Sequence, residues 1–278
     1  MVVFPPCKIN LGLSVLSKRT DGYHNLETCF FPLPWHDVLE AIKSESFAFT
    51  SSGNVIPGNA DENLCIKAYR LLRQDFDLSP VNIHLHKIIP TGAGLGGGSS
   101  DAAYTLRLLN EIFSLQLSRQ TLMDYAARIG SDCAFFVQDG PMVGTGRGEI
   151  LREISVPLHD KYFVVVKPGI HVSTADAFSD IKPAATARSN AEVVREYPVT
   201  SWKEYLKNDF EETVFKKHPA IKVLKEKLYS FGAIYAAMSG SGSAVFGIFD
   251  TEVNISRQFQ FPGAAVWSGF SEASRIDD

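Results

Sequence analysis

Pro90-Thr-Gly-Ala-Gly-Leu-Gly-Gly-Gly-Ser-Ser-Asp101 carries five glycines between positions 92 and 98. The segment before it, Val81 to Ile89, alternates apolar and polar residues, which predicts a β-strand. The segment after it has apolar residues at helical spacing, and Ser99, Ser100 and Asp101 are residue types that favour a helix N-cap. We therefore expect a strand, a glycine loop and a helix N-terminus. Such a unit presents backbone N–H groups to an anion, and its glycines allow a polyphosphate to approach closely.

The glycine loop fits two better-known nucleotide motifs poorly. No Lys-Ser/Thr pair follows its last glycine, so it is not a Walker A loop. Gly92-x-Gly94-x-x-Gly97 matches the dinucleotide fingerprint formally, but that fold needs a parallel strand after the helix. Here a second helix is expected instead, capped by Ser118 and ended by Gly130. A glycine linker without a ligand is the remaining alternative.

Composition limits the class of protein. The 278 residues are 45% hydrophobic, enough for one large or two modest domains with full cores. A net charge of −4 argues against nucleic acid or an anionic membrane as the main partner. The four cysteines are scattered, which predicts reduced thiols in a cytoplasmic protein. We expect neither a signal peptide nor a membrane span.

The N-terminal segment Cys7 to Leu16 alternates like a strand and carries two polar residues on one face. Lys8 and Asn10 are two positions apart and therefore point the same way. They share that face with the small residues Gly12 and Ser14, which leave room for another group to pack there. The face is either solvated or part of a binding site.

Three further segments place polar or aromatic side chains where a ligand could meet them. The turn at Asp21-Gly22 presents Tyr23 for stacking and His24 for hydrogen bonding, unless the ring merely covers the core edge. Asn63 begins a helix predicted over residues 61–76, where it either caps the helix or contacts a ligand. Asp132 precedes an apolar run and is either a turn residue or a base for a substrate hydroxyl group.

The residue pattern in the second half of the chain predicts a mixture of helices and strands. Ser173 to Asp176 resembles a capping box and places Phe178 near a helix start, whereas residues 182–200 show no clean period and are expected to be irregular. Helices are expected over residues 209–217 and 219–231, and strands over 233–238 and 244–249. The small-residue loop between those strands, 239–243, is either a tight turn or a second backbone wall for phosphates.

Five motifs then occur in order: Lys8-Ile-Asn-Leu-x-Leu, Asp21-Gly-Tyr-His, Pro90-x-Gly-x-Gly-Leu-Gly-Gly-Gly-Ser-Ser100, Gly130-Ser-Asp132 and Ser239-Gly-Ser-Gly242. Over nearly the whole chain the sequence resembles the GHMP kinase superfamily of galactokinase, homoserine kinase, mevalonate kinase and phosphomevalonate kinase. The Asp-Gly-Tyr-His stretch resembles members that act on a cytidine-diphosphate-linked alcohol. Two departures stand out: Cys7 replaces a frequent Ala, and Asp132-Cys133-Ala134 replaces a frequent Asp-Val-Pro.

The resemblance implies transfer of the ATP γ-phosphoryl group, with Mg²⁺, to the 2-hydroxyl group of a cytidine-diphosphate-linked methylerythritol in non-mevalonate isoprenoid biosynthesis. It implies Asp132 as general base with Lys8 beside it, and it fixes no Mg²⁺ ligand. For ATP it implies Pro90, Thr91, Gly92, Ala93, Gly94, Leu95, Gly96, Gly97, Gly98, Ser99, Ser100, Asn63 and Lys87. For the cytidine substrate it implies Asn10, Tyr23, His24, Phe178, Ser239, Gly240, Ser241 and Gly242.

The expected fold is α+β, with an N-terminal domain over residues 1–155, a C-terminal domain over 156–278 and the active site in the cleft between them. The expected partners are ATP and the cytidine-linked polyol, and the protein is expected to be a cytoplasmic monomer or homodimer. Three alternatives stay open: a kinase of another small alcohol, a nucleotide-binding protein without catalysis, and a dinucleotide-dependent oxidoreductase.

Overall fold

The computed structural model describes residues 1–254 and 263–271, and the chain forms two compact units. Unit 1 takes residues 1–7, 35–91 and 96–139, and unit 2 takes residues 8–34, 92–95 and the chain from 140 onward. The chain therefore passes between the units several times, within the glycine loop among other places. The domain boundary expected at residue 155 stays a prediction.

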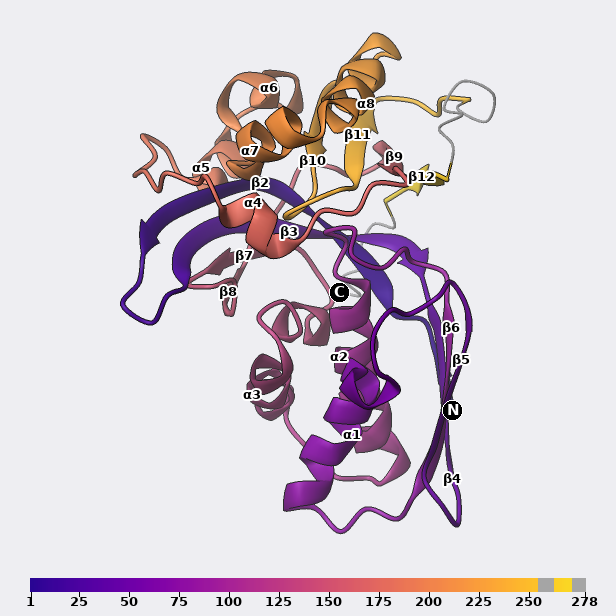
Figure 1. The fold of residues 1–278 in the computed structure, drawn as a ribbon. Coiled ribbons are helices and arrows are strands. Elements are labelled where there is room, and N and C mark those ends of the chain that lie inside the picture. Colours follow the sequence, from indigo (N-terminus) through magenta and orange to yellow (C-terminus); the bar gives the residue numbers. More distant parts are fainter. Residues whose placement is uncertain (255–262, 272–278) are drawn as a thin grey trace. The chain divides into compact units, whose positions relative to one another are not determined.

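Unit 1 contains a four-stranded sheet with helices beside it (Figure 1). The strand order is β1-β4-β6-β5, with β5 and β6 parallel and the other two neighbouring pairs antiparallel. Its strands are β1 (Val2–Val3), β4 (Val38–Lys43), β5 (Ala48–Gly53) and β6 (Val81–Lys87), and its helices are α1 (Leu64–Asp75), α2 (Gly97–Ile112), α3 (Arg119–Ile129) and the 3₁₀ turns η1 (Ala60–Glu62) and η2 (Ala134–Val137).

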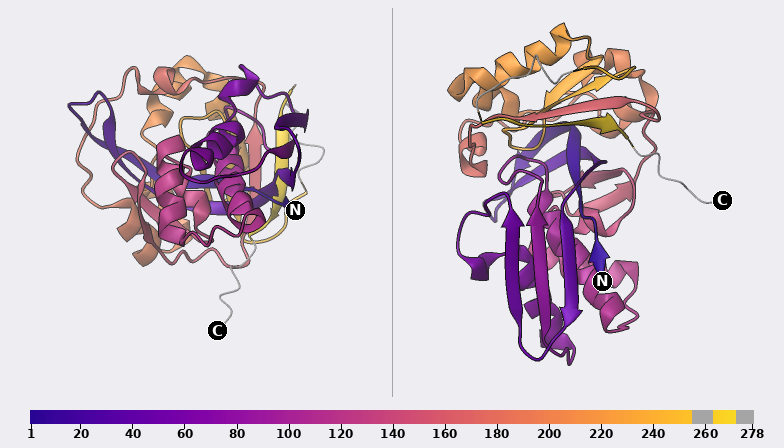
Figure 2. Two further views of the ribbon diagram at one scale, coloured as in Figure 1. Left: turned by 90° about the horizontal axis from the view of Figure 1, so that it is seen from below. Right: turned by 90° about the vertical axis from the view of Figure 1, so that its right-hand side faces the viewer.

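Local sequence signals explain the elements of unit 1. On β6 the apolar residues Val81, Ile83 and Leu85 are buried, as their alternation predicts. The strands of this sheet lie side by side in Figure 2 (right), and α1 and α2 pack against each other. The predicted helix ends around α3 are confirmed, because the Ser118 side chain accepts a hydrogen bond from the Thr121 N–H group and Gly130 follows the last turn.

The described residues of unit 2 form two four-stranded sheets, ordered β2-β3-β7-β8 and β10-β11-β9-β12. The long strands β2 and β3 begin or end in unit 1 and run mainly through unit 2. The strands are β2 (Pro6–Lys18), β3 (His24–His36), β7 (Met142–Thr145), β8 (Ile150–Glu153), β9 (Tyr162–Lys167), β10 (Tyr235–Met238), β11 (Val245–Phe249) and β12 (Ala265–Phe270). The helices are α4 (Thr174–Phe178), α5 (Asn190–Glu196), α6 (Trp202–Tyr205), α7 (Phe210–Lys217), α8 (Pro219–Ser230) and the 3₁₀ turn η3 (Val199–Ser201).

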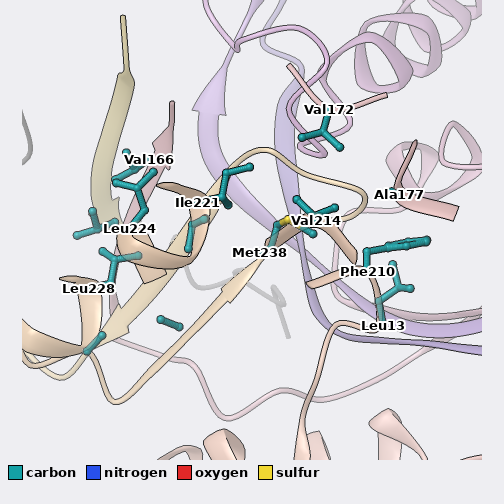
Figure 3. Close-up of a cluster of buried hydrophobic side chains, with 14 of the residues drawn as sticks. Leu13, Val166, Val172, Ala177, Phe210, Val214, Ile221, Leu224, Leu228 and Met238 are labelled. Carbon is teal, nitrogen blue, oxygen red and sulfur yellow. The ribbon is translucent and has the colours of Figure 1, made fainter. Parts of the chain in front are cut away.

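The core of unit 2 lies where α7 and α8 meet the sheet of β9, β10 and β11 (Figure 3). Leu224 and Leu228 of α8 face Val166 of β9, and Phe210 of α7 lies near Leu13 of β2. All five side chains are buried, so they remove apolar surface from water and stabilise the unit. The predicted positions of α7, α8, β10 and β11 are confirmed. The irregular segment expected over residues 182–200 is wrong in part, because α5 lies inside it.

The fold class is α+β, as predicted. No doubly wound parallel sheet occurs among the described residues, which contradicts the architecture that a dinucleotide-dependent oxidoreductase needs. All four cysteines are buried free thiols, as expected. Within residues 1–254 and 263–271, no helix has the length and apolar character of a membrane span.

Candidate active site

Lys8 and Asn10 lie on one face of β2, and both side chains are 2% exposed. Lys8 Nζ donates to Asn10 Oδ1 at 2.7 Å and to the Gly94 carbonyl oxygen at 2.9 Å. Asn10 Nδ2 donates to Thr28 Oγ1 at 3.0 Å, which fixes the amide orientation. The predicted shared face is confirmed, and the alternative of a solvated polar face is wrong. Removing an ammonium group from water costs free energy, and the two hydrogen bonds of Lys8 Nζ offset part of that cost. Because these bonds are directional, they also fix the position of the ammonium group.

The middle of the glycine loop, residues 92–95, packs against the small-residue loop 239–243 inside unit 2. Ala244 N–H donates to the Ala93 carbonyl oxygen at 3.1 Å, and Ser239 Oγ donates to that of Gly94 at 2.9 Å. Gly94 has φ +76°, and a Cβ atom there would overlap the Ser239 carbonyl oxygen. Only glycine therefore fits this position without strain. The glycine loop and the 239–243 loop, which the sequence analysis treats as separate motifs, therefore form one backbone surface.

Asn208 holds the second loop and was missed by the sequence analysis. Its Nδ2 atom donates to the carbonyl oxygens of Met238 and Gly240, at 2.8 Å each, and its Oδ1 atom accepts from the Phe210 N–H group. Asn208 is 3% exposed, so all three bonds are shielded from water. Its position two residues before the start of α7 is a local signal that could have indicated it, since Asn often bonds the first N–H groups of a helix.

The start of α2 differs from the prediction. The helix begins at Gly97, with Gly96 as a left-handed N-cap of φ 70° that makes no side-chain bond. The expected capping role of Ser99, Ser100 and Asp101 is therefore wrong, since all three lie inside the first turns. The reason is that the glycines can adopt the left-handed turn that starts the helix earlier. The first N–H groups of α2 point away from the helix body, where an anion can bind.

A buried ion cluster lies under this helix start, in unit 1. Lys87 Nζ donates to Asp101 Oδ2 at 2.7 Å and forms an ion pair with Asp37 Oδ2. Burial raises the pKa of Asp101 to about 7 despite the Lys87 ammonium group. The two carboxylates outweigh the effect of burial on Lys87 and raise its pKa. The predicted contact of Lys87 with ATP stays a prediction, as does that of Asn63, whose Oδ1 atom caps α1 by accepting from the Cys65 N–H group.

Asp132 lies in the turn after α3 and is half-buried. The Cys133 N–H group donates to the Gly130 carbonyl oxygen at 3.1 Å, and the buried turn η2 follows immediately. This backbone turn fixes the Cα position of Asp132 next to a packed segment. The predicted role of Asp132 as a general base stays a prediction.

The aromatic residues expected at the substrate's base lie together in unit 2. The rings of His24 and Phe178 stack with centroids 4.9 Å apart and planes 20° apart. Tyr23 is 56% exposed, and the Arg147 guanidinium group lies 5.0 Å from its ring centroid. Because the first two rings touch directly, a cytosine ring would stack on one of them or separate them. Their roles in substrate binding stay predictions.

The described residues contain no cluster of three or more His, Cys, Asp or Glu side chains that could hold a metal ion. Mg²⁺ commonly keeps several waters and binds through substrate phosphates with one or two protein carboxylates. The expected use of Mg²⁺ stays a prediction.

Two family models match the chain. The model of the GHMP kinases N terminal domain matches residues 63–142, and that of the GHMP kinases C terminal domain matches residues 195–264. The first match covers α1, β6, the whole glycine loop, α2 and α3, and the second runs from the last residues of α5 past the 239–243 loop and β11.

Similar proteins are named as kinases. A 4-diphosphocytidyl-2-C-methyl-D-erythritol kinase from Cytophaga hutchinsonii is 53% identical, over 91% of this chain and 93% of its own length. A relative of the same name from Bacteroides fragilis is 51% identical, over 92% and 95%. A solved 4-(cytidine 5′-diphospho)-2C-methyl-D-erythritol kinase has a TM-score of 0.74 at 32% identity, over 89% and 90%. Homoserine kinase from Cytophaga hutchinsonii shares the fold, with a TM-score of 0.77 at 15% identity over 98% and 94%.

Proposed function

Because the chain belongs to the GHMP kinase family, in the group of 4-diphosphocytidyl-2-C-methyl-D-erythritol kinases, we infer that it phosphorylates this substrate with ATP. The acceptor is the 2-hydroxyl group, and the reaction is a step of the non-mevalonate route to isoprenoid precursors. The observation that carries the inference is the likeness to the Cytophaga hutchinsonii relative, which covers 91% of the chain at 53% identity. ATP is a nucleotide of the cytoplasm, so we place the reaction there.

The phosphate groups of ATP are proposed to bind the backbone of residues 90–100. Glycines with positive φ at positions 92, 94 and 96 turn the chain sharply, and they carry no side chain that would keep a phosphate group away from the loop. The N-terminus of α2 adds N–H donors and the positive end of the helix dipole. Mg²⁺, when bound with the nucleotide, neutralises charge on the phosphates. This cradle supplies positioning, which accounts for much of the rate enhancement in phosphoryl transfer.

Asp132 is proposed to accept the proton of the substrate hydroxyl group as the oxygen attacks the γ-phosphorus, and the bond from that phosphorus to the bridging oxygen of ADP breaks as ADP leaves. A carboxylate at the end of a fixed backbone turn suits this role, and general-base help contributes about 10²–10⁴-fold. Lys8 is proposed to stabilise the negative charge on the transferring group. Its ammonium group already meets the Gly94 carbonyl oxygen in the glycine loop, so its position relative to that loop segment is set before ATP binds.

The cytidine end of the substrate is proposed to bind Tyr23, His24 and Phe178. The His24–Phe178 stack offers a flat apolar surface, and Tyr23 adds an exposed ring. Asn10 and the loop of Ser239, Gly240, Ser241 and Gly242 are proposed to contact the polar parts of the substrate. Asn10 also orients Lys8 through their hydrogen bond.

The test is a product assay with a panel of acceptors. Purified protein is incubated with Mg²⁺, ATP and one alcohol at a time: the cytidine-linked methylerythritol, homoserine, mevalonate or galactose. We expect a phosphorylated product, detected by ³¹P NMR and mass spectrometry, only with the cytidine-linked alcohol. Reactions without an alcohol measure background ATP hydrolysis. A product from another alcohol would indicate a different GHMP kinase activity, and ATP binding without any product would indicate a nucleotide-binding protein.

A further inference from the structure

The buried cluster of Lys87, Asp37 and Asp101 takes no part in the chemistry proposed above. The three side chains are at most 3% exposed, and they bring two carboxyl groups and one ammonium group into the interior. Burying charges costs free energy that their mutual attraction offsets only partly, and apolar side chains of similar size would often stabilise a fold as well. The position of the cluster beside the glycine loop suggests a role in holding that loop and the start of α2.

The cluster ties together the chain on both sides of the glycine loop. Before the loop, Asp37 Oδ1 accepts hydrogen bonds from the Ile88 and Ile89 N–H groups, at 2.5 Å and 2.8 Å. After the loop, Lys87 Nζ donates to Asp101 in the second turn of α2. The end of β6 and the start of α2 are therefore joined through side chains while the loop between them keeps its own path.

The first turn of α2 rests directly on this cluster. A Cβ atom at Gly97 would lie 2.9 Å from Lys87 Nζ and 2.9 Å from Ile89 Cγ2, so a larger residue there would force one of these side chains to shift. Gly97 is buried, so no water layer separates the helix start from the ammonium group. A displacement of Lys87 or Asp101 would therefore be transmitted to the backbone of the first helical turn.

We propose that Lys87, Asp37 and Asp101 form a positioning cluster that fixes the first turn of α2 in the orientation needed to bind the phosphates of ATP. The three residues are positioning residues, since none is required to touch the nucleotide. The proposal rests on the function proposed above, because it needs the N-terminus of α2 to bind ATP. It differs from the expected contact of Lys87 with ATP, since it gives that side chain a structural partner on each side of the loop.

The test uses three variants of the full-length chain. Asp101→Ala removes the tie to α2, whereas Asp101→Asn keeps an oxygen that can accept from Lys87 Nζ. Leu106→Ala is the matched control, because Leu106 is fully buried one turn further along the same helix and lies outside the cluster. For each protein we measure the ATP dissociation constant by calorimetry, KM for both substrates, kcat and Tm.

We expect Asp101→Ala to raise the ATP dissociation constant and the KM for ATP about tenfold, because small displacements of positioning groups are costly. The KM for the cytidine substrate is expected to change less than about twofold, and Asp101→Asn is expected to recover most of the ATP affinity. Leu106→Ala is expected to lower Tm without raising the KM for ATP more than the KM for the cytidine substrate. If Asp101→Ala does not fold, Lys87→Gln is measured instead, because glutamine can bond only one of the two carboxyl groups well. The same rise in the ATP dissociation constant and in the KM for ATP is expected.

Two results would overturn the proposal. One is an Asp101→Ala protein, or a Lys87→Gln protein, that binds ATP as wild type does. The other is an equal loss of affinity for both substrates that follows Tm, as in Leu106→Ala. Failure of the proposed function gives a different result, because the wild-type chain would then form no phosphorylated cytidine-linked alcohol in the product assay, or would itself bind no ATP.

Discussion

Ser239 Oγ donates a hydrogen bond to the carbonyl oxygen of Gly94 at 2.9 Å, although 145 positions separate the two residues in the sequence. The same carbonyl oxygen accepts a second hydrogen bond from Lys8 Nζ. The oxygen of a glycine-loop peptide is thus fixed by one neutral donor and one charged donor, both buried. This arrangement orients the peptide plane of Gly94, and with it the adjoining N–H group.

The first prediction concerns the fit at Gly94. Gly94→Ala would force a Cβ atom onto the Ser239 carbonyl oxygen and hold alanine at φ +76°. We expect Tm to fall by about 5–10 °C, because overlap in a packed interior and a left-handed alanine both cost free energy. Differential scanning calorimetry measures the change.

Gly98→Ala is the matched control for Gly94→Ala. The Cβ atom would lie 3.8 Å from Leu64 Cδ1, in ordinary contact, and the position is helical. Because alanine favours helix over glycine by about 1 kcal/mol, Tm is expected to stay constant or rise slightly. Equal Tm values for the two variants would contradict the described packing of the two loops.

The second prediction concerns the aromatic surface of unit 2. Phe178→Ala removes the ring that stacks on His24, and we expect the KM for the cytidine substrate to rise about tenfold, since stacking of a base on an aromatic ring contributes about 1–3 kcal/mol. The KM for ATP is expected to change less than about twofold. Tyr23→Ala is expected to act in the same direction. Steady-state kinetics with each substrate varied in turn measure both constants.

Tyr205→Ala serves as the control for these aromatic variants. Its ring is 41% exposed in the same unit and is not among the expected substrate contacts. Neither KM is expected to change. If Phe178→Ala raised both KM values equally, the ring would have only a packing role, in keeping with its edge contact to Phe210.

The third prediction concerns pH and stability. The pKa of Asp101 rises from 3.8 to about 7 in the folded protein, chiefly through burial. The groups around it are Lys87, Asp37 and the buried thiol of Cys65 on α1. The folded state therefore holds a proton on Asp101 that the unfolded state releases near about pH 4. Binding of this proton stabilises the folded state fully below the unfolded pKa, and the stabilisation is lost as pH rises through the folded pKa.

Asp101→Asn removes this titration and provides the comparison. We expect the Tm of wild type minus that of Asp101→Asn to fall as pH rises from about 5 to about 8. Over this range the buried Asp101 carboxyl group of wild type becomes ionised, which destabilises the folded state, whereas the asparagine does not titrate. Calorimetric scans of both proteins across this range measure the difference, in which the other titrating groups cancel. A difference that stays constant with pH would show that the Asp101 carboxyl group does not titrate in this range.

The sequence predicts elements well where burial follows a simple period. The alternation along β6 and the helical spacing of α8 reflect one buried face each, so local residues suffice to find them. The short helix α5 was overlooked although Ser189 and Glu192 form the beginning of a capping box, and the Ser189 side chain does accept from the Glu192 N–H group. That signal was available and could have identified the helix.

The polar residues that hold the site are harder to predict because their partners are far away in sequence. Asp37 bonds the backbone of Ile88, 51 positions later, and Asn208 bonds the carbonyl oxygen of Gly240, 32 positions later. Neither spacing leaves a local pattern, since side-chain to backbone bonds of this kind depend on the completed fold. Lys8 and the glycine loop were found because strand alternation and glycine content are local properties.

The general base is the central claim, and the kinetics of Asp132→Asn test it most directly. The amide keeps the size of the side chain but cannot accept the hydroxyl proton, so single-turnover measurements with saturating ATP and cytidine substrate isolate the chemical step. We predict a rate lower by about 10²–10⁴-fold, with the ATP dissociation constant within about threefold of wild type. A rate close to that of wild type would contradict the account, because another group would then have to take the proton.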